Sequence, residues 1–244
     1  MIGGMQLIIY YIRHGDPIYN PDSLTPLGIR QAEAVGRRLA LNGIDEIYSS
    51  PSIRAIQTAT PLSEMLHKPI INLDWCNESL VWNEFTVTNK EGKTDWMFRD
   101  PRIIEKFNER SIIELGDHWY KDPFFDKKVG EGVVRVNSEL DRFLINFGYY
   151  HDRENKIYRT DNPSNKRIAI FAHEDFGKIF FSSILDIPYP MFSIRFNISH
   201  SGVSVINFSV SNISVIVPEL LQHSNDSHLY KEGLPTKYNN GISI

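Results

Sequence analysis

The chain has 244 residues, of which 41% are hydrophobic and 23% are charged, a composition typical of a globular protein that buries a sizeable core. Its formal net charge of −4 argues against nucleic acid or an acidic membrane surface as a partner, so an anionic substrate would need a local basic pocket. The single cysteine, Cys76, excludes an internal disulfide and favours a reducing, cytoplasmic location, where its expected role is packing.

Membrane attachment is also not indicated. No apolar run approaches the roughly 20 residues that a bilayer-spanning helix needs. Met1–Gly4 lacks the charged start of a signal peptide, and the apolar run that follows ends at Arg13. We therefore expect neither a nucleic-acid nor a membrane partner, and the sequence does not indicate an oligomeric state.

The first predicted elements are a strand and a helix. The branched and aromatic run Leu7–Ile12 is typical of a buried strand, and it ends abruptly at Arg13-His14-Gly15. A helix is then predicted from its N-cap Thr25 to near Gly43. Its apolar stripe has helical spacing and consists of Ile29, Ala32, Val35, Leu39 and Ala40.

A second strand and helix follow in the same order. Ile44–Tyr48 predicts a strand, and Ser49–Ser52 begins a helix that carries Arg54 in its first turn. Pro61 should kink or shorten this helix. The alternation of strands and helices indicates parallel strands.

The middle of the chain, from about residue 80 to 166, has a different pattern. It is rich in charged and aromatic residues, with a helix predicted at Val133–Phe147 and a polar loop at Thr160–Lys166. We interpret this segment as a cap-like helical insertion that lies over the substrate, within one domain formed by residues 1–244.

The strand–helix pattern then resumes. Arg167–Ala172 predicts a buried strand followed by His173, and Phe176–Leu185 predicts a helix. Val203–Phe208 and Ile213–Val217 are expected to pair through a turn near residues 209–212, and the polar tail from residue 222 to extend over the surface. The predicted fold is α/β, a three-layer α/β/α sandwich with a mostly parallel sheet and the helical insertion over the active site.

Basic side chains follow three of the predicted strands. Arg13 and His14 end the first strand, Arg54 follows the second, and His173 follows the strand at 167–172. Ligands of α/β proteins bind at the carboxyl ends of parallel strands, so these side chains could converge. Two guanidinium groups and two imidazoles suit a phosphoryl group.

These motifs together resemble the histidine phosphatase superfamily, which includes the phosphoglycerate mutases. The matching stretches are Arg13-His14-Gly15, the run Leu24-Thr25-Pro26-Leu27-Gly28-Ile29-Arg30-Gln31-Ala32, the run from Ser49 to Ala59, and Ala172-His173. The resemblance implies a metal-independent phosphatase without a cofactor, acting on a small phosphomonoester. His14 would be the nucleophile that becomes a phosphohistidine, and Arg13, Arg54 and His173 would hold the phosphoryl oxygens.

The resemblance is less complete for two further residues. Asn20 lies where the family often has a phosphate-binding asparagine. Glu78 and Glu84 are both candidates for the proton donor, and we favour Glu78, although the glycines of the family pattern are absent here. The alternatives to a phosphatase are a phosphomutase of the phosphoglycerate mutase type and a non-catalytic module that binds a phosphorylated ligand.

Three histidines outside these motifs are further candidates for metal ligands. His200, His223 and His228 lie in the C-terminal part of the chain. For each, a solvated or turn-capping role is favoured over metal binding. We therefore predict no metal site.

Overall fold

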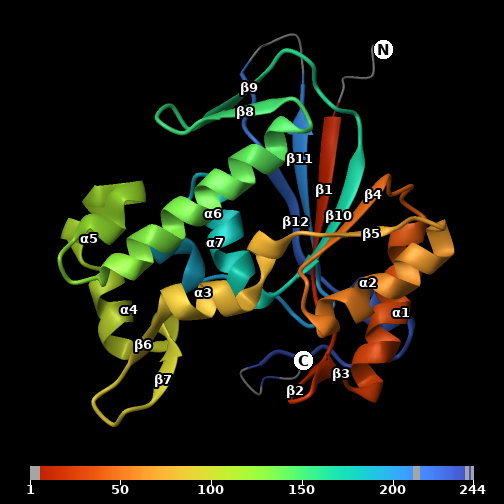
Figure 1. The fold of residues 1–244 in the computed structure, drawn as a ribbon, viewed down its shortest axis with the longest axis horizontal. Helices are drawn as coiled ribbons and strands as arrows, with labels where there is room; N and C mark the ends of the chain where they lie inside the picture. Colours follow the sequence, from red (N-terminus) through yellow and green to blue (C-terminus); the bar gives the residue numbers. More distant parts are fainter. Residues whose placement is uncertain (1–5, 211–214, 240–241, 243–244) are drawn as a thin grey trace.

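A six-stranded sheet forms the centre of the computed structural model, which describes residues 6–210, 215–239 and 242 (Figure 1). Its strands, in spatial order, are β12 (Glu219–Asn225), β11 (Val203–Ser209), β1 (Gln6–Arg13), β10 (Arg167–Ala172), β4 (Glu46–Ser49) and β5 (Ile70–Asn72). β1, β10, β4 and β5 are parallel to one another, whereas at one edge β11 is antiparallel to β1 and β12 is antiparallel to β11. The prediction of a mostly parallel sheet is confirmed.

Helices cover both faces of the sheet. α1 (Pro26–Ala40) and α2 (Ile53–Leu66) pack on one face, with α9 (Ser227–Lys231) against α1. The other face is covered by α3 (Glu78–Phe85), α6 (Lys127–Ile145), α7 (Glu174–Ile184) and α8 (Tyr189–Ser193). Figure 1 shows α1 and α2 to the right of the sheet and α3, α6 and α7 to its left. The three-layer α/β/α sandwich is therefore confirmed.

The alternation of side chains along β1 explains the two cores. Leu7, Ile9 and Tyr11 point into the cluster under α6 and α7, whereas Tyr10 and Ile12 point into the cluster under α1 and α2. Because successive side chains of a strand point to opposite faces, a continuous apolar run requires both faces to be covered.

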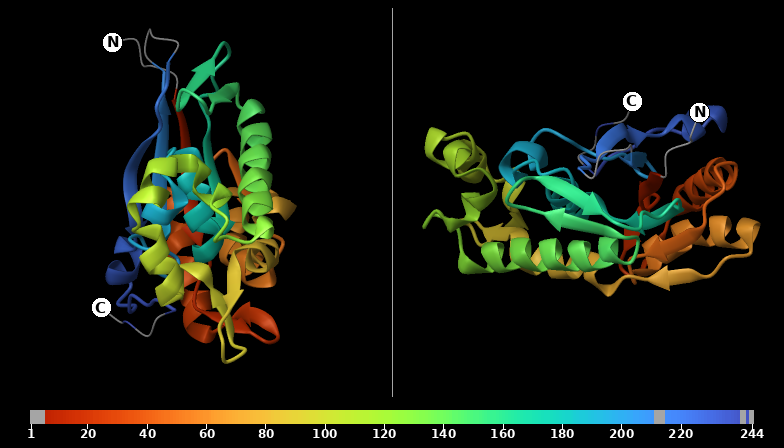
Figure 2. Two further views of the ribbon diagram at one scale, coloured as in Figure 1. Left: turned by 90° about the vertical axis from the view of Figure 1, so that its left-hand side faces the viewer. Right: turned by 90° about the horizontal axis from the view of Figure 1, so that it is seen from above.

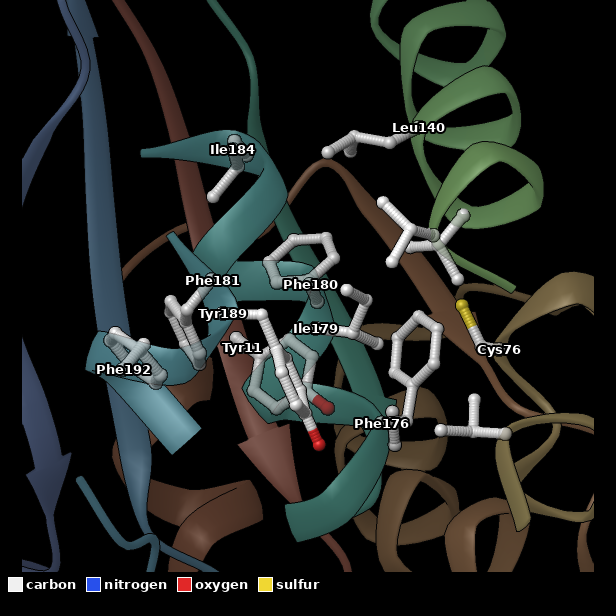
Figure 3. Packing of buried hydrophobic residues seen from close by; sticks show 14 of the residues in the cluster. Tyr11, Cys76, Leu140, Phe176, Ile179, Phe180, Phe181, Ile184, Tyr189 and Phe192 are labelled. Atoms are coloured by element: carbon white, nitrogen blue, oxygen red, sulfur yellow. The ribbon is translucent and has the colours of Figure 1, made fainter. Parts of the chain in front are cut away.

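Tyr11 lies at the centre of the larger core. Its ring is 4.9 Å from that of Phe180 and 5.0 Å from that of Phe181, and its hydroxyl donates to the carbonyl of His173 (Figure 3). Cys76 is fully buried in the same cluster, and burial raises the pKa of its thiol well above the usual range. A packing role for Cys76 fits this position.

Residues 74–160 contain the elements that differ from a simple strand–helix alternation. Besides α3 and α6, they form the short helices η1 (Asp74–Cys76), η2 (Met97–Arg99), α4 (Pro101–Phe107), α5 (Arg110–Leu115) and η3 (Gly116–Lys121). Two hairpins, β6 (Thr86–Thr88) with β7 (Thr94–Trp96) and β8 (Tyr149–Asp152) with β9 (Ile157–Thr160), were not predicted.

The two hairpins lie at opposite ends of the molecule. β6–β7 lies at the same end as the hairpin of β2 (Pro17–Tyr19) and β3 (Asp22–Leu24), toward which β1 runs, and β8–β9 lies at the other (Figures 1 and 2). The helical insertion therefore places its first hairpin at the carboxyl ends of the parallel strands.

The helix predictions hold in outline but not in every detail. α6 begins six residues before the predicted Val133, at Lys127, and α7 begins at Glu174. α2 continues past Pro61 to Leu66, so the proline does not end it. Ile29 of the predicted stripe is 50% exposed, whereas Ala32, Val35 and Leu39 are buried as predicted.

The predicted pairing near the C-terminus is wrong. The partner of β11 is Glu219–Asn225, and the polar tail forms this strand and α9. Ile216 instead pairs with Tyr158 of β9, donating and accepting backbone hydrogen bonds of 2.9 and 2.7 Å. Residues 211–214, which hold the second half of the expected turn and the start of the expected strand, lie outside the described part. β12 is a largely exposed edge strand, so it lacks the apolar alternation that marks strands in a sequence.

None of the helices within residues 6–210, 215–239 and 242 combines the length with the apolar character that crossing a bilayer would need.

Two glycines let the loop after β1 lie directly against α1. A Cβ atom on Gly28 would lie 2.2 Å from the carbonyl oxygen of Asp16, and one on Gly15 would lie 2.7 Å from the carbonyl oxygen of Gly28. Asp16 also accepts from the Thr25 hydroxyl at 2.7 Å, which ties this loop to the N-cap of the helix. The position of His14 thus depends on close backbone contact with α1.

We expect Gly28→Ala to lower the free energy of unfolding by about 1–3 kcal/mol, because the added methyl group overlaps backbone that cannot move freely. Urea unfolding followed by circular dichroism would measure this change. Arg30→Ala, at an exposed position of the same helix, serves as the control and should change stability by less than about 0.5 kcal/mol. Equal stability of Gly28→Ala and the parent chain would contradict the packing argument.

Candidate active site

The ends of three neighbouring strands lie in register. Arg13 of β1 pairs with Ala172 of β10, and Phe171 of β10 pairs with Ser49 of β4. The backbone NH of His14 donates to Ala172 and that of Ser50 donates to Phe171, at 2.9 and 2.8 Å. The residues that follow these strands therefore emerge side by side, as the positions of the motifs predicted.

The four basic side chains are brought together at this edge. The rings of His14 and His173 are 5.3 Å apart between centroids and meet edge to face. Arg54 Nη2 lies 3.2 Å from His173 Nδ1, and Arg13 directly precedes His14. Arg13, His14 and His173 are almost completely buried. A buried basic side chain attracts an anion strongly, because water does not screen the attraction between the two charges.

His14 is held in one orientation and one tautomer. Its Nδ1 lies 2.7 Å from the carbonyl oxygen of Gly15, which can only accept, so Nδ1 carries the proton. In the neutral ring, Nε2 is then left with a free lone pair. Burial lowers the pKa of His14 well below its usual range, and the neighbouring His173, Arg13 and Arg54 lower it further. The side chain is thus a neutral imidazole with Nε2 available for attack.

His173 is fixed by the loop after β4. Its Nε2 lies 2.8 Å from Ser50 Oγ and 3.3 Å from Ser52 Oγ. Burial, followed by the charges of Arg54 and Arg13, lowers the pKa of His173 well below the usual range. Ser50 and Ser52 belong to the stretch that carries the resemblance, but the sequence alone did not single them out.

Arg54 is positioned by two carboxylates. Its Nη1 donates to Asp22 Oδ1 at 2.7 Å and its Nη2 donates to Glu78 Oε2 at 2.6 Å. Asp22 also accepts from the backbone NH of Ile53 at the start of α2, so one side chain from β3 holds both the helix and its arginine. Nothing in the sequence pattern pointed to Asp22.

Arg13 has a different set of partners. Its Nη1 donates to the carbonyl of Ile198 and lies 2.9 Å from Glu174 Oε2. In the described part of the chain, Arg13 Nε, Arg13 Nη2 and Arg54 Nε are buried without a hydrogen-bond acceptor. Buried N–H groups without acceptors are costly, and an oxyanion bound between these residues would satisfy them.

Of the two candidate proton donors, the structure places only Glu78 beside the histidines. Glu78 begins α3, with Asn77 as its N-cap, and its Oε2 lies 3.4 Å from His173 Nδ1. Burial raises the pKa of Glu78 despite the opposing charges of Arg54 and Arg13. Glu84 instead forms a bidentate pair with Arg135 of α6, with both distances 2.6 Å.

Asn20 does not join the cluster. It is exposed in the turn between β2 and β3, whereas Tyr19 and Asp22 on either side of it line the adjoining cavity. A phosphate-binding role for Asn20 stays a prediction.

His200 lies closer to the cluster than its sequence context suggested. Its ring is stacked 6.0 Å from that of His14, its Nδ1 is 3.2 Å from Asp16 Oδ1, and its Nε2 is 2.8 Å from Asn239 Oδ1. Burial, followed by the charge of Arg13, lowers the pKa of His200 to about 4. Of the two predicted roles, solvated or turn-capping, the solvated one is wrong for His200, which is 3% exposed, and for His228, which is 4% exposed.

A cavity of about 850 Å³ adjoins the cluster. Arg54 and Glu78 line its inner part, and Trp82, Trp96 and Arg99 line its walls. The walls therefore come from α3, β7 and η2, within the segment predicted to lie over the substrate. The cavity can hold a small organic molecule beside the basic cluster.

His14, Glu78 and His173 could in principle hold a metal ion, since their ligand atoms lie within 4.8 Å of one another among the described residues. The guanidinium of Arg54 already contacts both Glu78 and His173, and the charge of a second guanidinium, that of Arg13, lowers the pKa of both His14 and His173. Two fixed positive charges disfavour a further cation, so the electrostatics of this cluster suit an anion.

Comparisons with known proteins agree with the resemblance read from the motifs. Residues 9–108 match the model of the histidine phosphatase superfamily (branch 1). A curated relative from Hydrogenobacter thermophilus, named "Putative phosphoserine phosphatase 2", is 34% identical over 97 residues. The alignment covers 36% of this chain and 45% of that relative, so it spans less than half of the relative's length.

Solved structures share the fold over most of the chain. Phosphoserine phosphatase from Entamoeba histolytica aligns with a TM-score of 0.55 and 19% identity, covering 91% of this chain and 99% of that one. Phosphoglycerate mutase from Bacillus anthracis aligns with a TM-score of 0.58 and 16% identity, covering 95% and 98%. A mycobacterial glucosyl-3-phosphoglycerate phosphatase aligns with a TM-score of 0.56 and 16% identity, covering 91% and 99%.

We expect His14 to remain a neutral imidazole at pH 6.5, the ordinary pKa of histidine, because its lowered pKa moves protonation to more acidic solution. Nitrogen-15 spectra of ring-labelled protein should show Nδ1 protonated and Nε2 unprotonated. His14→Ala would assign the signals by their loss. An imidazolium at this pH, or the opposite tautomer, would contradict the geometry.

Proposed function

We propose that this chain, which over residues 9–108 belongs to the histidine phosphatase superfamily, is a metal-independent phosphatase that hydrolyses a small phosphomonoester through a phosphohistidine. Two features of the cluster carry the proposal. His14 is held through its Nδ1, which leaves Nε2 free to attack, and Arg13 and Arg54 in the same cluster have buried N–H groups without an acceptor in the described part of the chain. Three of the four similar proteins named above are phosphatases, which also supports it.

The first chemical step follows from this arrangement. Nε2 of His14 attacks phosphorus, the P–O bond to the alcohol breaks, and the carboxyl group of Glu78 gives its proton to the leaving oxygen. Arg13, Arg54 and His173 bind the phosphoryl oxygens and stabilise the charge that develops on them. The raised pKa of Glu78 favours the protonated form that this step needs.

The second step returns the enzyme to its starting state. Glu78, now a carboxylate, takes a proton from water while the water oxygen attacks phosphorus and the P–Nε2 bond breaks. Inorganic phosphate leaves, and both His14 and Glu78 regain their initial protonation. The chain's own residues supply every group in the cycle, so no metal or cofactor has a role in it.

The substrate is proposed to be small. The cavity beside the cluster has a volume of about 850 Å³, which is enough for a drug-sized molecule and too small for a folded protein. The structural relatives include complexes with phosphoserine and 3-phosphoglyceric acid, which are small phosphorylated compounds. A cytoplasmic location is part of the proposal, since Cys76 is a free thiol.

A phosphomutase is the second candidate, because the fold also matches a phosphoglycerate mutase. A mutase would pass the phosphoryl group from His14 to a second hydroxyl group rather than to water. Release of inorganic phosphate from a simple ester, without a bisphosphate primer, would favour the phosphatase. A module that only binds a phosphorylated ligand would have no need of a nucleophile.

His14→Ala should reduce hydrolysis of p-nitrophenyl phosphate by a factor on the order of 10³ or more, because no other group can form the covalent intermediate. Rapid acid-free quenching with ³²P-labelled substrate should trap phosphohistidine on the parent chain and none on the variant. Assays in EDTA should give the same rate as assays without it. Unchanged turnover by His14→Ala would exclude the proposed mechanism.

Glu78→Gln should slow phosphohistidine formation from alkyl phosphates by about 100-fold and from p-nitrophenyl phosphate by less than about tenfold, because only the poor leaving group needs the proton. With the parent chain, the rate on alkyl phosphates should fall as the pH rises through the raised pKa of Glu78, and the variant should lack this fall. Single-turnover kinetics would measure both effects.

Glu84→Gln is the matched control for this experiment. Glu84 lies on the same helix but pairs with Arg135, so its removal should leave the dependence on the leaving group unchanged. Equal losses on both kinds of ester for Glu78→Gln would argue against its role as the acid.

A further inference from the structure

Asp175 is a buried carboxylate that the proposed mechanism does not use. It is the second residue of α7 and is 4% exposed, yet it lines the same cavity as Arg54 and Glu78. Its Oδ1 has no hydrogen-bond donor within the described residues. Its nearest cation among the described residues is Arg99, whose Nη2 lies 3.9 Å from Asp175 Oδ1 and whose side chain is 38% exposed.

The neighbouring Glu174 lies closer to cations than Asp175 does, although its Oε2 also has no hydrogen-bond donor within the described residues. Its Oε2 lies 2.9 Å from Arg13 Nη1 and its Oε1 lies 3.6 Å from Lys178 Nζ. Asp175 has no cation closer than Arg99 at 3.9 Å within the described residues, and both Glu174 and Glu78 repel its charge. Burial, then Glu174 and Glu78, raise the pKa of Asp175 well above its usual range.

A purely structural role for Asp175 explains these facts poorly. An acidic residue in the first turn of a helix gains from the helix dipole, but that gain is small and does not require burial. A buried polar oxygen without a partner is costly, and such groups in native proteins call for an explanation. A ligand group that donates a hydrogen bond would supply the missing partner.

We propose that Asp175 is a specificity residue that accepts a hydrogen bond from a hydroxyl or ammonium group on the alcohol part of the phosphomonoester. The inference rests on the proposed function and narrows its substrate to short phosphorylated polyols or amino alcohols. Trp82 and Trp96 form an apolar wall of the same cavity, with ring centroids 4.9 Å apart, and offer no acceptor of their own.

The test compares three esters of similar size: ethyl, 2-hydroxyethyl and 2-aminoethyl phosphate. We expect kcat/KM of the parent chain to be at least about tenfold higher for the better of the two donor-bearing esters than for ethyl phosphate. Asp175→Leu should bring this ratio to near one. Asp175→Asn keeps the shape and removes the charge, so it should lose any preference for the ammonium group.

Thermal stability provides a second readout. Removal of a buried carboxyl group without a partner should raise the Tm of Asp175→Leu by about 2–4 °C, whereas loss of a structural contact would lower it. Asp161→Asn is the control, because Asp161 is exposed and is not among the residues that line this cavity. Its ratio of kcat/KM values should equal that of the parent chain.

The possible outcomes separate the two proposals. Turnover of p-nitrophenyl phosphate with no preference among the three esters, or an unchanged preference in both Asp175 variants, overturns the role of Asp175 and leaves the phosphatase intact. No turnover of any ester by the parent chain overturns the proposed function itself.

Discussion

The site depends on two guanidinium groups held below the protein surface. Buried positive charge needs nearby negative charge, and the fold provides Glu174 for Arg13 and Asp22 with Glu78 for Arg54. These three acidic residues come from segments far apart in the sequence. They leave several N–H groups of the two arginines without an acceptor in the described part of the chain. Burial, together with these positive charges, lowers the pKa of both histidines and favours their neutral form, so the nucleophile and the anion-binding groups depend on one buried arrangement.

Much of this arrangement could be predicted from the sequence, because it depends on local patterns. The apolar runs before Arg13 and before His173 form strands with both faces buried, and a run of that kind has few other structural solutions. Once β1, β4 and β10 are parallel neighbours, the residues after them must meet at one edge. The sequence motif around Glu78 also favoured this residue over Glu84 as the candidate proton donor.

Other features depend on contacts that leave no periodic signal. β12 is polar and mostly exposed, so its pairing with β11 is visible only in three dimensions. His200 has an unremarkable sequence context, but the turn at Ser201, with φ of 58°, brings it against His14. Asp22 and Asp175 are ordinary acidic residues in the sequence, and only their burial beside Arg54 and in the cavity distinguishes them.

The strand order has a consequence for how the chain reaches its active form. β10 lies between β1 and β4, although it is made more than a hundred residues after them. A nascent chain that ends before residue 167 holds the nucleophile, but its first two parallel strands have no common neighbour to join them and each exposes an unpaired edge. Assembly of the catalytic centre is thus coupled to insertion of one late strand. The region matched by the family model cannot form this sheet as an isolated fragment.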